Sequence, residues 1–236
     1  MSHAIRTPMN VIMGFTNIAL QHADDSDKMK ECLEKIRVSG SNLQELIDDV
    51  LDISRIESEE FKIVSQPVKL PELFDFYCQA IAGMAEAKNI RFSGKLHDIS
   101  HNVLLSDQIR LGQIYMNLLS NAVKYTPSGG HIRLAACEGE KNTVRITVQD
   151  DGIGIPAEDV PRLFERFYRV DKARSRAAGG TGLGLSIATE IVQRHHGSLT
   201  LVDRPGPGTT VRLELPITQP APGAPEDTAE NTSAQQ

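Results

Sequence analysis

Apolar residues recur along the first part of the chain at the spacing of an α-helix. Ile5, Met9 and Ile12 follow one another at intervals of four and three residues, and Ala19 comes seven residues later. These intervals place all four side chains on one helical face. The pattern therefore predicts a first helix over residues 4–19.

A seven-residue repeat follows and predicts a second helix over residues 29–57. Its stripe combines two interleaved series, Ile36, Leu43 and Val50 with Ser39, Leu46 and Ile53. The polar residues 21–27 between the helices predict a turn that ends in a helix cap. The candidate caps are Asp25, Ser26 and Asp27.

Two helices joined by a short turn form an antiparallel hairpin, which leaves much of its apolar surface in water. This exposure favours a homodimer, in which two hairpins close into a four-helix bundle. The alternative is a monomeric hairpin that packs on the domain that follows it.

Beyond residues 59–63 the pattern changes, and we place a domain boundary there. The predicted helices cover residues 71–88, 107–125 and 185–196, and the predicted strands cover residues 90–96, 131–137, 143–150, 198–203 and 209–216. This order indicates a two-layer α/β sandwich, so that the fold class of the whole chain is α+β. Gly197 is expected at the C′ position of the last helix. We expect three regions: residues 1–60, residues 61–217 and a disordered tail over residues 218–236.

The composition, 40% hydrophobic and 24% charged, is that of a folded protein. A net charge of −6, from 25 basic and 31 acidic residues, argues against nucleic acid as a partner. Cys32, Cys78 and Cys137 lack the spacing of a disulfide framework or a zinc site, which favours a reducing compartment. No run of about 18 apolar residues predicts a membrane span. We expect a cytoplasmic segment without membrane contact, and any membrane anchor of a longer parent lies outside it.

The segment NLLSNAVKYT carries polar groups on one side of a predicted helix. Asn117, Asn121, Lys124 and Tyr125 stand at steps of four, three and one. Amide oxygens ligate hard cations such as Mg²⁺, lysine binds phosphate, and an aromatic ring can lie against a base. A solvated polar helix face accounts for the same residues equally well.

Two glycine motifs follow. In VQDDGIGIP, Asp150 ends a predicted strand, and Gly152 and Gly154 permit a turn that lets the backbone approach a ligand, although an ordinary tight turn fits too. In GGTGLGLSIATEIV, glycines lead directly into a helix, a geometry that directs backbone N–H groups to phosphate. Its spacing matches neither the dinucleotide-binding fingerprint nor the P-loop. Its glycines are Gly179, Gly180, Gly182 and Gly184.

The segment LFERFYRVDKARSRAA between these motifs is unusually basic for an acidic chain. Its basic residues are Arg166, Arg169, Lys172, Arg174 and Arg176; together with Arg162 just before the segment, they surround Phe164 and Phe167. A basic segment bounded by glycines suits a mobile lid over a triphosphate. A solvated helix face is the alternative interpretation.

In their order and spacing, these segments resemble the transmitter region of sensor histidine kinases over residues 2–216. SHAIRTPMN is similar to the family's H box, NLLSNAVKYT to its N box, DDGIGIP to G1, LFERF to the F box and GGTGLGL to G2. The resemblance implies a dimerising phosphotransfer hairpin, then the ATP-binding sandwich shared with gyrase, heat-shock chaperone and mismatch-repair ATPases. It also implies ATP and Mg²⁺ as cofactors and a response-regulator receiver domain as the partner.

The resemblance also implies catalytic roles. His3 would accept the γ-phosphoryl group of ATP and pass it to an aspartate of the receiver. Thr7 matches the position that helps water to attack the receiver's phosphoaspartate, and Pro8 would kink the first helix. Arg169 would stabilise the transferred phosphoryl group.

For the nucleotide, the resemblance assigns a role to each motif. Asn117 would ligate Mg²⁺ with Asn121 nearby, and Lys124 would meet phosphate. Tyr125 would contact the adenine, while Asp150 would accept a hydrogen bond from its amino group, with Gly152 and Gly154 shaping the turn. The phosphate end of the lid would consist of Gly180, Thr181, Gly182, Leu183 and Gly184.

One position departs from the family pattern, because Ala4 stands where an acidic residue usually follows the histidine. A carboxylate there fixes the imidazole tautomer and accepts its proton, which is worth roughly 10²–10⁴-fold in rate. We therefore expect ATP binding with weakened phosphorylation of His3, unless water or another side chain substitutes. Because family helices begin upstream of the histidine, we also expect the sensor input to precede this segment.

Two other functions remain open. The first is a non-catalytic module whose binding of a receiver domain depends on bound nucleotide. Phosphatase action on the receiver would instead be a property of the histidine kinase. A gyrase- or chaperone-like ATPase shares the nucleotide motifs but does not account for SHAIRTP on a dimerising helix.

Overall fold

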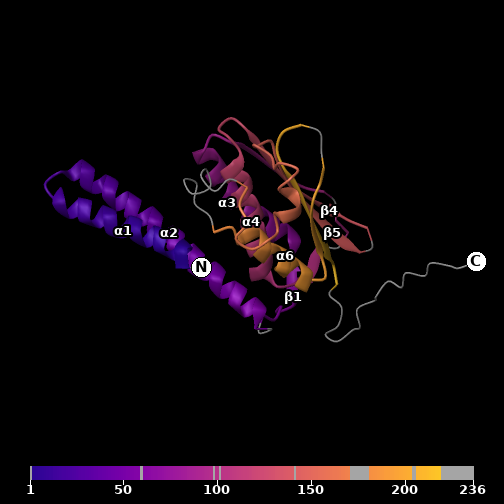
Figure 1. Ribbon diagram of the computed structural model, residues 1–236. Helices are drawn as coiled ribbons and strands as arrows, with labels where there is room; N and C mark the ends of the chain where they lie inside the picture. The colour runs from indigo at the N-terminus through magenta and orange to yellow at the C-terminus, as the bar shows by residue number, and fades with distance from the viewer. Residues whose placement is uncertain are drawn as a thin grey trace, which may run out of the picture.

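The computed structural model describes residues 2–58, 61–97, 99–100, 102–140, 142–170, 181–203 and 206–218, and for residues 2–4 it describes the backbone alone. The chain forms a long helical hairpin followed by an α/β domain (Figure 1). This arrangement confirms the predicted fold class. The predicted tail lies outside the described residues, apart from Thr218.

The hairpin consists of α1 (Ser2–Gln21) and α2 (Ser26–Glu57). Among the candidate caps, Asp25 begins α2, because its carboxylate accepts hydrogen bonds from the backbone N–H groups of Asp27 and Lys28. Both helices extend a few residues beyond the predicted ranges.

The seam between the two helices follows the predicted seven-residue repeat. Ser39 and Leu46 are buried in it, and Cys32 continues the same series one heptad earlier. The hydroxyl of Ser39 donates a 3.0 Å hydrogen bond to the carbonyl of Pro8 across the seam. Other apolar side chains of the hairpin stay exposed in the single chain; examples are Met13, Leu20, Leu33, Ile47 and Leu51.

The α/β domain contains a mixed five-stranded sheet with the order β2-β4-β5-β7-β6. Its strands are β2 (Arg91–Leu96), β4 (His131–Glu138), β5 (Thr143–Asp150), β6 (Ser198–Leu201) and β7 (Thr210–Pro216). Strands β2 and β4 are parallel, and the other neighbours are antiparallel. A separate antiparallel pair joins β1 (Gln66–Lys69) to β3 (Val103–Ser106), two strands that are absent from the predicted ranges.

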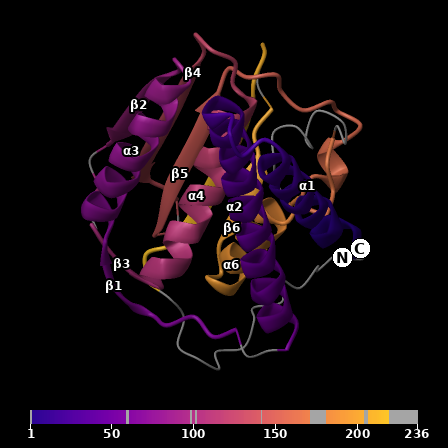
Figure 2. The ribbon, with the colours of Figure 1, turned by 90° about the vertical axis from the view of Figure 1, so that its left-hand side faces the viewer.

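Three helices cover one face of this sheet: α3 (Leu70–Ala87), α4 (Gln108–Tyr125) and α6 (Gly184–Arg194) (Figure 2). A short 3-10 turn, η1 (Val160–Arg162), lies in the segment between β5 and α6. The core forms where alternate residues of the strands meet the apolar helix faces, for example at Ile146, Ile114 and Ile191. No helix of the described residues has the length and apolar content that crossing a bilayer requires.

The end of α6 corrects the predicted role of Gly197. His196, with φ of 55°, occupies the left-handed C′ position, and its N–H donates to the carbonyl of Gln193. Gly197 follows at C″ and donates to the carbonyl of Val192, which completes a Schellman motif. Gly197 is instead required for space, since a Cβ there would lie 2.4 Å from the carbonyl oxygen of Glu214.

A buried histidine ties the end of α6 to the start of α4. His195 is fully buried, and its Nδ1 atom lies 2.8 Å from the carbonyl of Ile191. Its Nε2 atom accepts a hydrogen bond from the N–H of Asp107, the residue that caps α4. With Nδ1 donating and Nε2 accepting, the imidazole is neutral. Burial accordingly lowers the pKa of His195.

We expect His195→Gln to lower the free energy of unfolding by about 1–3 kcal/mol near neutral pH, because buried polar groups lose their partners. The native pKa of His195 is lowered, so its stabilising contribution is complete above the unfolded value of 6.5 and declines as pH falls. The difference in unfolding free energy between wild type and variant should therefore become smaller as pH falls. Urea titrations from about pH 8 to about pH 5 measure it, and a constant difference would contradict the assignment.

The C-terminal half of α2 packs on the α/β domain through polar contacts. The carboxylate of Asp52 accepts hydrogen bonds from Arg110 at 3.0 Å and from Gln113 at 2.7 Å, both on α4. One α2 turn earlier, Asp49 accepts a 2.5 Å hydrogen bond from the hydroxyl of Thr181. Near the end of the helix, Glu57 pairs with Arg166. The hairpin and the domain are therefore joined at several points.

The segment after α2 is held by two guanidinium groups. Phe61 is buried, and its ring lies 4.2 Å from the guanidinium carbon of Arg110 and 5.3 Å from that of Arg194. Arg194 also donates to the carbonyls of Ile56 and Phe61, at 3.0 and 2.9 Å. A cation thus lies at the C-terminal end of α2, where it stabilises the helix dipole.

Burial raises the pKa of Asp49 to about 6, and Glu45, Asp48 and Asp52 on the same helix act in the same direction. The docked arrangement therefore favours the protonated carboxyl group, so the docking of α2 at Asp49 should weaken as pH rises through about 6, although the hydrogen bond from Thr181 by itself favours the carboxylate. As pH rises through about 6, we therefore expect faster hydrogen exchange of the Leu183 amide, which donates to the Thr181 hydroxyl. The measured rates are corrected for the pH dependence of intrinsic exchange.

Asp49→Asn should abolish this pH dependence, because an amide does not titrate in this range. Asp48→Asn is the matched control, since Asp48 lies next to Asp49 on the exposed side of α2. Equal pH dependence in Asp49→Asn and in wild type would contradict the expectation.

Candidate functional site

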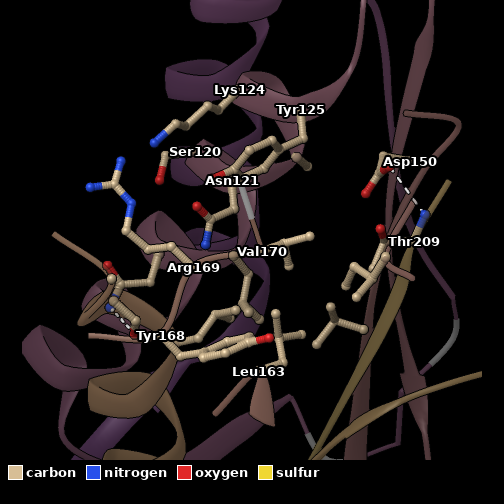
Figure 3. Close-up of a pocket in the computed structure, with 18 of the residues that line it drawn as sticks. Ser120, Asn121, Lys124, Tyr125, Asp150, Leu163, Tyr168, Arg169, Val170 and Thr209 are labelled. Atoms are coloured by element: carbon tan, nitrogen blue, oxygen red, sulfur yellow. Dashed lines mark hydrogen bonds between the residues drawn. The ribbon is translucent and has the colours of Figure 1, made fainter. Parts of the chain in front are cut away.

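A cavity of about 500 Å³ lies between the end of α4, the end of β5, the segment after η1 and the start of α6 (Figure 3). One wall comes from α2, through Asn42, Glu45 and Asp49. The cavity therefore includes residues of both the hairpin and the α/β domain.

The predicted polar face of α4 is confirmed. Asn117, Asn121, Lys124 and Tyr125 all line the cavity. The Nδ2 atom of Asn117 donates a 2.9 Å hydrogen bond to the carbonyl of Gly184, which joins α4 to the first residue of α6. Since the amide nitrogen has this partner, the Oδ1 atom is the group of Asn117 suited to accept from a donor or a cation. The Nζ atom of Lys124 lies 5.3 Å from the centre of the Tyr125 ring.

Asp150 reaches the cavity because of the strand period. Alternate residues of β5 face the helices, and Val144, Ile146 and Val148 fill that face before Asp150. Asp150 is 7% exposed, and its Oδ1 atom accepts hydrogen bonds from the N–H groups of Gly152 at 2.9 Å and Thr209 at 3.1 Å. The strand thus ends in a buried carboxylate whose orientation is fixed by the backbone.

Two glycines bring the turn after β5 against α4. A Cβ at Gly152 would lie 2.6 Å from the carbonyl oxygen of Tyr125, and Gly154 has φ of 71°. This approach allows the N–H of Ile153 to donate to the same carbonyl at 3.3 Å. The turn and the end of α4 therefore form one continuous wall.

Sequence reasoning missed Gly208 and Thr209. A Cβ at Gly208 would lie 2.0 Å from the carbonyl oxygen of Asp150, and its φ is 97°. Thr209 lines the cavity and binds Asp150. The glycine-rich PGPGTT before the last strand was the available signal. The residues Ser120 and Tyr168 and the α2 wall were missed as well.

The second glycine motif packs against the segment after η1. The N–H of Phe167 donates to the carbonyl of Gly182 at 2.9 Å, and Gly182 has φ of 75°. Thr181, Gly182 and Gly184 line the cavity, whereas Leu183 is fully buried and anchors the motif in the core. Gly179 and Gly180 lie outside the described residues.

The basic residues before the second glycine motif have different surroundings. Arg162 pairs with Glu165 at 3.2 Å and lies over the Tyr168 ring, and Arg166 pairs with Glu57. Neither lines the cavity. Arg169 does, and its Nη2 atom is buried without a hydrogen-bond partner among the described residues. The remaining basic residues, Lys172, Arg174 and Arg176, lie outside the described residues.

The two ends of the cavity carry side chains of opposite charge. Figure 3 shows Asp150 and Thr209 on one side and Lys124 and Arg169 on the opposite side, with Tyr125 between them. A ligand with a hydrogen-bond donor at one end and negative charge at the other therefore matches the cavity.

The predicted phosphorylation residues lie on the hairpin. His3 and Thr7 belong to α1, which starts next to the α/β domain rather than at the far tip of the hairpin (Figure 1). Thr7 is exposed and does not line the cavity, and the side chains of His3 and Ala4 lie outside the described residues. Pro8 lies inside α1, which continues through it.

Two family models match the chain. Residues 1–59 match the His Kinase A phospho-acceptor domain, and residues 106–219 match the histidine kinase-, DNA gyrase B- and HSP90-like ATPase.

Curated relatives match nearly the whole chain. Histidine protein kinase DivJ of Caulobacter vibrioides is 38% identical over 92% of this chain and 36% of its own length. Sensor protein GacS of Pseudomonas syringae is 36% identical over 98% of this chain and 25% of its own length. Sensor histidine kinase WalK of Bacillus subtilis is 34% identical over 91% of this chain and 35% of its own length. The chain thus spans about a quarter to a third of these proteins.

Solved structures match in fold. Histidine kinase ThkA in complex with the response regulator protein TrrA has a TM-score of 0.72 and 25% identity, over 92% of this chain and 60% of that one. Full-length ShkA in complex with AMPPNP has a TM-score of 0.71 and 26% identity, over 93% of this chain and 45% of that one. With a phospho-acceptor hairpin followed by this type of ATPase domain, the chain belongs to the transmitter regions of sensor histidine kinases.

Proposed function

We propose that the chain is an ATP-dependent protein-histidine kinase of two-component signalling. It transfers the γ-phosphoryl group of ATP to His3 and then to an aspartate of a response-regulator receiver domain. The observation that carries the proposal is the polar cavity, which has a buried carboxylate at one end and two cationic side chains at the other. In this proposal residues 1–60 carry the phosphorylated histidine and residues 61–217 bind the nucleotide.

The base is held at the carboxylate end. Asp150 accepts a hydrogen bond from the exocyclic amino group of adenine, because its carboxylate is buried and held in place by two backbone N–H groups. Tyr125 lies against the base, and the turn at Gly152 and Gly154 leaves room for it. A bound AMPPNP in the ShkA structure supports a nucleotide of this kind.

The phosphates are held at the cationic end. Lys124 and Arg169 supply charge, and within the described part of the chain the buried Nη2 atom of Arg169 has no hydrogen-bond partner that it would lose. The N-terminal end of α6, with Gly182 and Gly184 in the cavity wall, adds backbone N–H groups and the positive end of a helix dipole.

Asn117 fits a role in Mg²⁺ binding, and Asn121 lies beside it in the cavity wall. Among the described residues no group of three or more His, Cys, Asp or Glu side chains gathers around a metal position. Mg²⁺ at a nucleotide site takes few ligands from protein and the rest from phosphate and water, so a single amide oxygen is consistent with it. The ion would neutralise phosphate charge during transfer.

Phosphoryl transfer joins the two parts of the chain. A ring nitrogen of His3 forms a bond to phosphorus as the bond between phosphorus and the ADP oxygen breaks, and the ring then carries positive charge on its other N–H. Ala4 offers no carboxylate to accept that proton or to fix the tautomer. The expected autokinase is therefore weak.

The hairpin provides the contacts with other chains. Its exposed apolar residues, among them Met13, Leu20 and Leu51, are buried when two hairpins form a homodimeric four-helix bundle. The ThkA–TrrA complex supports a receiver domain as partner, and the exposed Thr7 would assist dephosphorylation of that receiver. A non-catalytic, nucleotide-gated receiver-binding module is the second candidate, and Ala4 is the observation that favours it.

Asp150→Asn should weaken the binding of Mg-ATP roughly 10- to 100-fold, because a hydrogen bond to a charged group is worth about 1.5–3 kcal/mol. Isothermal titration calorimetry measures the affinity. Asp151→Asn is the control, since Asp151 binds the N–H of His131 and does not line the cavity. Unchanged affinity in Asp150→Asn would defeat the proposed nucleotide orientation.

Ala4→Glu should raise the initial rate of His3 phosphorylation roughly 10²–10⁴-fold by restoring the general base. Incorporation of acid-labile ³²P and mass spectrometry of the phosphohistidine measure this rate, and Ala4→Glu combined with His3→Gln is the blank. Nucleotide binding without phosphohistidine in either chain would favour the non-catalytic module. An ordinary rate in the unaltered chain, with no gain from Glu, would contradict the role given to position 4.

A further inference from the structure

A lysine outside the cavity binds the end of the helix that lines it. Lys88 follows α3, and its Nζ atom donates hydrogen bonds to the carbonyls of Val123, Lys124 and Thr126 at 2.8, 2.8 and 2.9 Å. An ammonium group has three N–H donors, so every donor of the Lys88 ammonium group has a partner in this cluster. Lys88 does not line the cavity itself.

These contacts complete the hydrogen bonding of the last turn of α4. The final carbonyls of a helix lack partners within the helix. The carbonyl of Ala122 accepts from the N–H of Thr126 at 3.0 Å, and that of Tyr125 accepts from Ile153 at 3.3 Å. Lys88 serves the carbonyls of Val123 and Lys124 and that of the following residue, Thr126. Its positive charge also lies at the negative end of the α4 dipole.

The next residue, Asn89, extends the clamp to the turn after α4. The carbonyl of Asn89 accepts from the N–H of Gly129 at 2.7 Å, and its Nδ2 atom donates to the hydroxyl of Ser128 at 3.2 Å. Asn89 adopts φ of 56° to make these contacts. Residues 123–129 are therefore held from one side by a two-residue segment far away in the sequence.

We propose that Lys88 is a positioning residue for the nucleotide. It fixes the backbone of the last turn of α4, and this turn carries the side chains of Lys124 and Tyr125 that enter the cavity. The inference rests on the proposed function, and it adds a residue that neither touches the ligand nor belongs to a recognised motif. A small rotation of this turn displaces a phosphate contact and a base contact together.

Lys88→Met keeps the length of the side chain and removes all three donors. We expect roughly 5- to 30-fold weaker binding of Mg-ATP, measured by calorimetry well below the unfolding temperature. In the nucleotide-free variant we also expect faster hydrogen exchange of the Ile153 amide, because its acceptor lies on the released turn. Lys88→Arg should not restore affinity, since a planar guanidinium cannot direct three donors at three converging carbonyls.

Two controls separate positioning from stability. Ile81→Val removes a buried methyl group from the same helix α3, so it should lower the unfolding temperature and leave the affinity unchanged. Lys95→Met removes an exposed charge from β2 and should change neither quantity. If Lys88→Met does not fold, Lys88→Gln retains part of the donor set and takes its place.

Wild-type affinity together with wild-type exchange in the variant overturns the inference. Faster exchange with unchanged affinity also overturns it, since Lys88 then stabilises the turn without positioning the nucleotide. A wild-type chain that binds no nucleotide defeats the proposed function itself, and Ile153 exchange still reports separately on the clamp.

Discussion

The site depends on one buried carboxylate at the end of a strand. A carboxylate that leaves water loses several kcal/mol of solvation unless hydrogen bonds replace it. Asp150 receives them from Gly152, in its own turn, and from Thr209, the residue just before the neighbouring strand β7. Both contacts require backbone to approach closely, which the absence of side chains at Gly152 and Gly208 permits. The glycines near Asp150 are therefore part of what makes a charged group tolerable there.

The contact between the hairpin and the α/β domain also depends on largely buried charged groups that have hydrogen-bond partners. Asp52 and Arg110 are mostly buried, with 15% and 19% of their side chains exposed, and Gln113 satisfies the second carboxylate oxygen. A buried ion pair contributes little net stability, but loss of one partner leaves a costly unpaired charge. The pair therefore specifies how α2 sits on α4 more than it strengthens the fold. Through α4, the orientation of the hairpin is connected to the wall of the cavity.

Local patterns predicted most of the fold and half of the site. Helices α2 and α4 and strands β4 and β5 follow from apolar periods, and the polar face of α4 follows from the same spacing. Strand β3 was missed because its sequence VLLS does not alternate between apolar and polar residues, since two of its exposed positions are apolar and one of its buried positions is a serine. Thr209 could not be found because its position opposite Asp150 depends on the register of β5 with β7. Likewise, Asp49 enters the cavity wall only when α2 packs on the domain.

Clustered charge predicted the site least reliably, because the sequence of an arginine cluster does not show which groups its side chains contact. Arg162 and Arg166 find carboxylates at Glu165 and Glu57, and only Arg169 of the described basic residues in that segment faces the cavity. Ala4 belongs to a different part of the chain from the charged side chains that we assign to the nucleotide. Every described residue that we assign to the nucleotide lies in the α/β domain, whereas the proposed acceptor and its missing carboxylate lie on the hairpin. Binding and transfer therefore rest on separate structural units, and a chain of this design can lose catalytic rate at position 4 while the nucleotide cavity stays intact.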